Sequence, residues 1–265
     1  MRVDKLLLSQ NKFSSRAKAQ EAISQGKVFL ADGKPVKKSS LDLPDDTAFT
    51  IKNHDNYVSR GAYKLLKAIE VFHLDFTDKM VLDIGASTGG FTQVALNAGA
   101  KKVYALDVGS GQLNTTLVED PRVIVIENYN FRYAKENDFP PEKFDLIQCD
   151  VSFISLKHII PPASTLLKPN GKAVFLIKPQ FEAGKEYIRK HGLVKDSAVH
   201  LAVLQQVLGY FVENGFKVKG LSYSPIKGQH GNVEFLVQVQ KSEESSNPYS
   251  EKDLKLLIKD AKTNL

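Results

Sequence analysis

The sequence predicts an α/β domain with a doubly wound, seven-stranded sheet whose last strand is antiparallel, preceded by a small α+β unit. A short apolar run, a glycine-rich turn and a helical pattern follow one another over residues 79–99, and further apolar runs alternate with helical segments up to residue 240. Such alternation is typical of a largely parallel sheet with helices on both faces. We expect domains at residues 1–55 and 56–241, and a flexible tail or short helix at residues 242–265.

The first 55 residues contain two helical patterns, a turn and a short strand. Apolar residues along residues 3–8 mark the first helix, and Ser15 can cap a second helix over residues 16–24. The segment 27–36 predicts a hairpin, because β-prone residues flank an Ala-Asp-Gly-Lys turn. Residues 48–51 are expected as the last strand of this unit.

The positive charge of the chain is concentrated at its N-terminus. Residues 1–40 hold nine Lys or Arg against three Asp or Glu, and this excess equals the net charge of +6 of the whole chain. A basic excess at one end is typical of a module that binds a polyanion. The alternative is a solvated basic face without a partner, and charge alone does not decide between the two.

Residues 79–99 have the pattern of a nucleotide-binding strand, turn and helix. The strand ends in Asp83, and Gly85, Gly89 and Gly90 form a turn whose missing side chains let backbone approach a ligand. The next strand ends in Asp107, roughly 20 residues on, where a carboxylate can accept two ribose hydroxyls. These features indicate a cofactor that contains adenosine.

The spacing of the glycines and the first acid narrows the choice of cofactor. Gly-Ala-Ser-Thr-Gly-Gly differs from the dinucleotide motif G-x-G-x-x-G. Asp83 precedes the first glycine by two residues, where it would repel a pyrophosphate but suits the sulfonium and amino groups of S-adenosylmethionine. We favour S-adenosylmethionine over a dinucleotide, and over a loop that only turns the chain.

The large domain continues the alternation of strands and helices. Helical spacing extends over residues 57–72 and 197–214, and Gly215 ends the second of these helices. Five more strands are expected at residues 122–126, 144–150, 173–177, 217–224 and 233–240.

Four ionisable residues lie at predicted strand ends or on the helix that precedes the sheet: Lys64, Asp150, Lys178 and Glu234. Because ligands of such sheets bind at the carboxyl ends of the strands, we expect these side chains to converge beside the cofactor. Buried charges are costly unless paired, and two lysines with two acids can pair completely. Taken singly, each residue could be an ordinary surface or capping charge.

The N-terminal pattern Arg-x-Asp-x-Leu-Leu, at residues 2–7, is followed by matching positions at Ser15, Arg16, Ala19, Ile23, Gly26, Val28 and Gly33. Together they resemble the small RNA-binding domain of ribosomal protein S4. The resemblance implies that basic side chains of the second helix and the hairpin lie along an RNA backbone. The residues concerned are Arg2, Arg16, Lys18, Lys27, Lys34 and Lys37.

Six further segments are specific in combination: SRGAYKL, DIGASTGGFTQ, ALDVG, CDVSFISL, LIKPQFE and QHGNVEF. They resemble the haemolysin A (TlyA) family, which comprises ribosomal RNA 2′-O-methyltransferases with an FtsJ-like, Rossmann-like catalytic domain. The resemblance implies S-adenosylmethionine as cofactor, ribosomal RNA or a ribosomal subunit as partner, a cytidine ribose as substrate, and the four ionisable residues as the family's Lys-Asp-Lys-Glu tetrad. It also implies a cofactor site formed by Asp83, Gly85, Ser87, Gly89 and Asp107, with Asn130 near the adenosine.

Other methylation chemistries lack their motifs in this chain. The segment Asp-Val-Ser-Phe at residues 150–153 replaces the Asn/Asp-Pro-Pro-aromatic motif of amino-methylating enzymes, and Cys149 has no second cysteine for carbon-5 methylation of pyrimidines. A ribose hydroxyl is a poor nucleophile, whereas a sulfonium methyl is already activated, so the enzyme must mainly align them and remove a proton. Lys178 is our choice as the base, with Lys64 beside it, although either lysine could take the proton.

Composition also bears on location. The single cysteine excludes an intramolecular disulfide, and the six histidines have no ligand spacing, so no metal is expected. The start does not resemble a signal peptide, and no run approaches the roughly 20 apolar residues of a membrane span. We expect a cytoplasmic enzyme without a membrane as primary partner. The rival hypotheses are a secreted haemolysin and an RNA-binding protein without catalysis.

Overall fold

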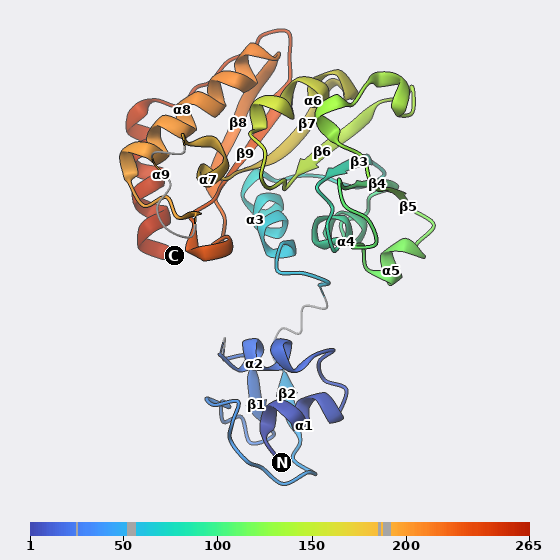
Figure 1. The fold of residues 1–265 in the computed structure, drawn as a ribbon, viewed down its shortest axis with the longest axis vertical. Coiled ribbons are helices and arrows are strands. Elements are labelled where there is room, and N and C mark those ends of the chain that lie inside the picture. The colour runs from blue at the N-terminus through green and yellow to red at the C-terminus, as the bar shows by residue number, and fades with distance from the viewer. Residues whose placement is uncertain (25, 52–56, 185–186, 188–191) are drawn as a thin grey trace. The chain divides into compact units, whose positions relative to one another are not determined.

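The computed structural model describes residues 1–265 except residues 25, 52–56, 185, 186 and 188–191 (Figure 1). The chain forms two compact units, Met1–Asn56 and Tyr57–Leu265. Each unit has its own hydrophobic core, so each is described by itself.

The small unit consists of two helices and a two-stranded antiparallel sheet. Its elements are α1 (Val3–Ser9), α2 (Arg16–Ser24), β1 (Val28–Leu30) and β2 (Phe49–Ile51). The sequence predicts a hairpin over residues 27–36, and the structure contains its turn, closed by the Leu30 amide, which donates to the Lys34 carbonyl at 2.9 Å. The continuous partner of β1 is β2, however, because Pro35 has no amide hydrogen and forms only an isolated bridge with Phe29.

The large unit is built on one mixed sheet with the order β5-β4-β3-β6-β7-β9-β8 (Figure 1). Its strands are β3 (Met80–Ile84), β4 (Lys102–Leu106), β5 (Val123–Ile126), β6 (Phe144–Cys149), β7 (Leu167–Ile177), β8 (Phe216–Tyr223) and β9 (Phe235–Lys241). Strand β9 is antiparallel to both of its neighbours, whereas the pairs from β5 to β7 are parallel. The predicted seven-stranded sheet with an antiparallel last strand is confirmed.

Helices cover both faces of this sheet. Alternate residues of β3 separate two core clusters: Val81 packs with α3 (Ala62–Phe72), α4 (Gly90–Asn97) and α5 (Thr115–Val118), and Leu82 packs with α6 (Ile160–Leu166) and α8 (Ser197–Glu213). The short helix α7 (Pro179–Glu182) follows β7 directly. Three-residue 3-10 helices lie at Phe131–Tyr133, Glu136–Asp138, Leu156–His158 and Gln229–Gly231.

The C-terminal residues form a helix where the sequence favours a tail or a short helix. Helix α9 (Glu251–Asn264) begins with a capping box in which the side chains of Ser250 and Asp253 bond each other's backbone amides. Leu254, Ile258 and Ala261 are buried against the cluster that contains α8. Burial of this apolar stripe orders a segment whose isolated helix would be marginal.

Within the described part of the chain, no helix combines the length and the apolar character needed to cross a bilayer.

Candidate active site

A cavity of about 420 Å³ lies at the carboxyl ends of β3, β6 and β7. Three sets of residues line it: the chain that leads into α3, the glycine loop after β3, and residues at or after the ends of the central strands. They are Ser59, Arg60, Gly61, Lys64, Gly85, Ala86, Ser87, Thr88, Gly90, Phe91, Asp150, Ser152, Lys178, Ile226, Lys227 and Gly228. The sheet therefore places its cavity at the edge where the sequence predicts a ligand.

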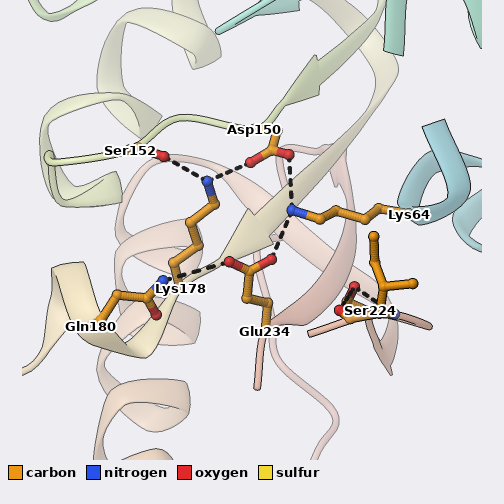
Figure 2. A network of polar contacts seen from close by, with 8 residues as sticks. Lys64, Asp150, Ser152, Lys178, Gln180, Ser224 and Glu234 are labelled. Carbon is orange, nitrogen blue, oxygen red and sulfur yellow. Dashed lines mark hydrogen bonds and ion pairs between the residues drawn. The ribbon is translucent and has the colours of Figure 1, made fainter. Parts of the chain in front are cut away.

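The four ionisable residues predicted to converge do so here (Figure 2). The Lys64 ammonium lies 3.2 Å from Asp150 Oδ2 and 2.8 Å from Glu234 Oε2. The Lys178 ammonium lies 2.6 Å from Asp150 Oδ1. Asp150 thus pairs with both lysines, one through each oxygen, and Glu234 pairs with Lys64. Lys64 comes from α3, Asp150 and Lys178 directly follow β6 and β7, and Glu234 directly precedes β9.

The two lysines have different electrostatic surroundings although each is only 8% exposed. Burial alone would lower the pKa of Lys64, but Asp150 and Glu234 outweigh burial and hold that pKa above its usual value. Burial likewise raises the pKa of Asp150, and the two lysines outweigh it, so the pKa is lowered. Lys64 is therefore held as an ammonium between two carboxylates, whereas Lys178 has one carboxylate partner.

Two further side chains extend this network, and sequence reasoning missed both. Ser152 Oγ accepts a hydrogen bond from Lys178 Nζ at 2.8 Å, and Gln180 Nε2 donates to Glu234 Oε1 at 3.5 Å (Figure 2). The sequence offers one indication of their role: Ser152 follows Asp150, and Gln180 follows Lys178, by two residues.

The glycines of the loop after β3 are needed by the protein's own packing. Gly85 has φ +85°, and a side chain there would come within 2.7 Å of the Asp150 carbonyl oxygen. A Cβ at Gly90 would lie 2.2 Å from Ser59 Oγ, so this glycine lets the segment before α3 approach α4. The sequence predicts close approach of a ligand at this turn, and the structure shows that protein groups also approach it.

Two predicted cofactor residues do not line the cavity. Asp83 is fully buried, and its carboxylate accepts a hydrogen bond of 2.6 Å from Thr92 Oγ1 of α4. Burial raises the pKa of Asp83 to about 7. Gly89 faces the protein, because a Cβ there would lie 2.2 Å from Leu117 Cδ1. Both residues contact the protein side of the glycine loop, and their predicted contact with a cofactor stays a prediction.

Asp107 lies next to the glycine loop, and neither Asp107 nor Asn130 is among the lining residues. Asp107 accepts hydrogen bonds of 2.8 Å from the amides of Ser87 and Gly109, which bring the carboxylate to the loop. Asn130 accepts a bond of 3.1 Å from the Arg132 amide and thus caps the 3-10 helix 131–133. Of the predicted cofactor residues, Gly85 and Ser87 line the cavity directly.

Comparison with known proteins decides the family. A model described as FtsJ-like methyltransferase matches residues 57–241, and an S4 domain model matches residues 1–45. The chain is 45% identical over 242 residues to YqxC of Bacillus subtilis (strain 168), across 90% of this chain and 85% of that protein. It is 39% identical to the 16S/23S rRNA (cytidine-2'-O)-methyltransferase TlyA of Mycobacterium tuberculosis (strain ATCC 25618 / H37Rv), across 89% and 88% of the two chains. The chain belongs to the TlyA family of FtsJ-like methyltransferases.

A solved structure supports this membership over the full length. The Streptococcus thermophilus protein is 43% identical, has a TM-score of 0.78, and covers 100% of this chain and 96% of its own. The cofactor of the TlyA-family methyltransferase is S-adenosylmethionine. The cavity fits it: the residues of the glycine loop that line it present mostly backbone, and the carboxylate of Asp107 lies beside the loop, where a ribose could displace its contact with the Ser87 amide.

The S4 domain of this family member carries the six basic residues predicted to bind RNA. Arg2 and Arg16 pair with the fully buried Asp4, at 3.1 Å and 2.8 Å, and Lys34 pairs with Asp32 at 2.7 Å. Lys18 and Lys37 are exposed, and Lys27 is half-buried. The arginines therefore serve the core of this unit as well as its surface, a dual role that a list of basic residues does not reveal.

Proposed function

We propose that the protein transfers the methyl group of S-adenosylmethionine to the 2′-hydroxyl of a ribose, a cytidine ribose, in ribosomal RNA. The observation that supports this most is the cluster of Lys64, Asp150, Lys178 and Glu234 beside the glycine loop in one cavity. The choice of ribosomal RNA and cytidine rests on TlyA of Mycobacterium tuberculosis, a 16S/23S rRNA (cytidine-2'-O)-methyltransferase. Such a substrate would place the enzyme in the cytoplasm.

The cofactor would be held by backbone and side-chain groups around the glycine loop. Gly85 and Ser87 would contact the methionine half, Asp107 the ribose, and residues near Asn130 the adenine, while Asp83 and Gly89 act through the loop. When bound, S-adenosylmethionine supplies an electrophilic methyl group on a positively charged sulfur. The remaining task of the chain is to orient the ribose oxygen and to take its proton.

The two lysines would divide this task. Lys64 stays an ammonium because two carboxylates hold it, so it is suited to orient the nucleophilic oxygen. Lys178, with one carboxylate, would first release a proton to solvent, and its neutral amine would then accept the proton of the 2′-hydroxyl through Nζ. The oxygen–carbon bond then forms as the carbon–sulfur bond breaks, and the positive charge lost at sulfur appears at Lys178. Asp150 would stabilise that charge.

The domains would share the work of binding. We propose that residues 1–55 anchor the RNA, since their first forty residues hold nine Lys or Arg against three Asp or Glu, and that residues 56–241 perform catalysis. The test is incubation of the purified protein with ribosomal RNA or subunits and methyl-labelled S-adenosylmethionine, followed by alkaline hydrolysis and mapping. A 2′-O-methylated cytidine resists hydrolysis of its phosphodiester bond and is expected. Label on a base would overturn the reaction, and label on another ribose would overturn cytidine alone.

A further inference from the structure

Within the described residues, the ammonium of Lys178 contacts two polar side chains. Its ammonium forms an ion pair with Asp150 Oδ1 at 2.6 Å and donates a hydrogen bond to Ser152 Oγ at 2.8 Å. Asp150 is shared with Lys64, but Ser152 is not (Figure 2). Ser152 lines the cavity together with both lysines. Its hydroxyl is therefore the polar neighbour that distinguishes Lys178 from Lys64.

A neutral amine accepts a proton only along its lone pair, and rotation about the Cε–Nζ bond changes where the lone pair points. Two acceptors are needed to hold the two N–H bonds, which leaves the lone pair in the third tetrahedral direction. At Lys178 these acceptors are Asp150 and Ser152, which lie beyond the end of its side chain in Figure 2. Without the hydroxyl, one N–H bond loses its acceptor and the lone pair can turn away from the substrate.

Ser152 is held in place independently of Lys178. Glu182, four residues after Lys178, accepts hydrogen bonds of 2.6 Å from Ser155 Oγ and 2.8 Å from the Leu156 amide. This contact ties the loop after β6 to α7, and at the other end of the loop the Asp150 amide donates to the Ile84 carbonyl at 3.1 Å. The hydroxyl is thus preorganised before any substrate binds.

We propose that Ser152 is a positioning residue for methyl transfer: its hydroxyl directs the lone pair of the Lys178 amine at the 2′-hydroxyl of the substrate. The proposal rests on the proposed function in that the direction matters only if Lys178 accepts the proton. In the step itself, the proton moves from the ribose oxygen to Lys178 Nζ, the oxygen–methyl bond forms and the methyl–sulfur bond breaks. Ser152 exchanges no atom in this step.

Three variants of the full-length protein test the proposal. Ser152→Ala removes the acceptor, Ser152→Thr keeps a hydroxyl, and Ser164→Ala removes a hydroxyl of α6 that does not line the cavity. We expect Ser152→Ala to lower kcat about 10- to 100-fold through lost orientation, while KM for RNA and Kd for S-adenosylmethionine change less than about twofold. Ser152→Thr should restore the rate, and Ser164→Ala should keep the wild-type kcat and KM.

A second measurement separates failure of this proposal from failure of the proposed function. Acylation of Lys178 by a small amine-reactive reagent, followed by mass spectrometry, reports on the amine without RNA. Ser152→Ala should change that rate more than about threefold, and Ser164→Ala should not. An unchanged acylation rate and kcat in Ser152→Ala would overturn the positioning role, as would an equal loss in Ser164→Ala without rescue by Thr. A changed acylation rate in a protein that does not methylate ribosomal RNA would refute the proposed substrate and leave the Ser152–Lys178 coupling intact.

Discussion

Asp150 pairs with both Lys64 and Lys178, but the two lysines have different further partners. Lys64 is locked between Asp150 and Glu234, whereas Lys178 has Asp150 and a neutral hydroxyl. An ammonium between two carboxylates is stabilised in its protonated form. The geometry therefore favours Lys178 as the group that changes its protonation state.

Replacement of Lys178 by alanine should lower methyl transfer at least about 100-fold, as expected for loss of a general base. Affinity for S-adenosylmethionine should stay within a few-fold, because the residue acts on the hydroxyl. Rates of methyl transfer and calorimetric titration of the cofactor measure the two effects. Lys255→Ala, an exposed change on α9, is the control and should leave both unchanged. Full activity of the Lys178 variant would refute the assignment.

The buried carboxyl group of Asp83 should make the free energy of unfolding depend on pH. Its pKa is about 7 in the fold and 3.8 in an unfolded reference, so the folded state keeps a proton that the unfolded state loses. Stability therefore falls as pH rises from about 4 to about 7, by up to about 4 kcal/mol for this group. Asp83→Asn should flatten that part of the profile, measured by urea unfolding at pH 5 and pH 8.

The control for this change is Asp260→Asn, on the exposed side of α9, which should leave the pH profile as it is. If wild type and Asp83→Asn differed equally at both pH values, the carboxylate of Asp83 would already be ionised in the fold. A direct contact with the cofactor would instead be indicated if Asp83→Asn abolished cofactor binding without any change in stability.

Sequence reasoning found the four charged residues because strand ends of a doubly wound sheet converge at one edge. It did not find Ser152, since a serine in a loop has no property in sequence that separates a capping hydroxyl from one aimed at a lysine. It assigned Asp83 and Gly89 to the ligand, which stays a prediction, and it did not foresee that both residues contact the protein. Orientation of a side chain depends on neighbours from distant segments, such as Thr92 and Leu117, which spacing does not encode.

At the scale of elements, α9 shows what a local pattern cannot decide. Its apolar residues are few and its polar residues many, which is compatible with a tail or with a helix on a surface. The strands of the central sheet were easier to predict, because buried parallel strands are short, continuously apolar and rich in branched residues. The helix is stabilised because Leu254 and Ile258 pack against α8 and β8.

Two substitutions within α9 measure that docking. Ile258→Ala removes a side chain that is 2% exposed, so it should lower the free energy of unfolding by about 2–5 kcal/mol. Leu256→Ala, on the same helix, removes a side chain of a residue that is 58% exposed and should change it by less than about 0.5 kcal/mol. Urea unfolding followed by circular dichroism gives both values. Equal effects of the two changes would mean that α9 is not docked in solution.

At the scale of the whole molecule, the N-terminal basic excess and the cavity lie in different units. Residues 1–40 hold nine Lys or Arg against three Asp or Glu, and the methyltransferase domain contains the cavity. Phosphate contacts give affinity and position, but they carry no sequence information directly. Choice of the target nucleotide should then depend on the large unit, and strength of binding on the small one.

Lys18 and Lys37 provide a test in the intact chain, because both are exposed and neither forms an ion pair that the described residues show. Replacing both by alanine should weaken RNA binding and reduce the slope of log K against log salt by roughly 0.7–0.9 per charge. The control, Lys252→Ala with Lys259→Ala on α9, should leave the slope as in wild type. Arg16 is less suitable, since its loss also deprives the buried Asp4 of a partner. An unaltered slope in the Lys18 and Lys37 variant would remove the S4 domain as the anchor.

The position of β9 between β7 and β8 has a consequence for synthesis of the chain. Strand β8 precedes β9 in sequence, but its partner in the sheet is β9, which in turn pairs with β7. Strand β8 can therefore join the sheet only through β9. During translation the growing chain therefore carries an unpaired strand until residue 241 has left the ribosome. Glu234 directly precedes β9, so the ion pair between Lys64 and Glu234 forms only when β9 has joined the sheet. The cluster of Lys64, Asp150, Lys178 and Glu234 is therefore completed only when the segment that leads into β9 is in place.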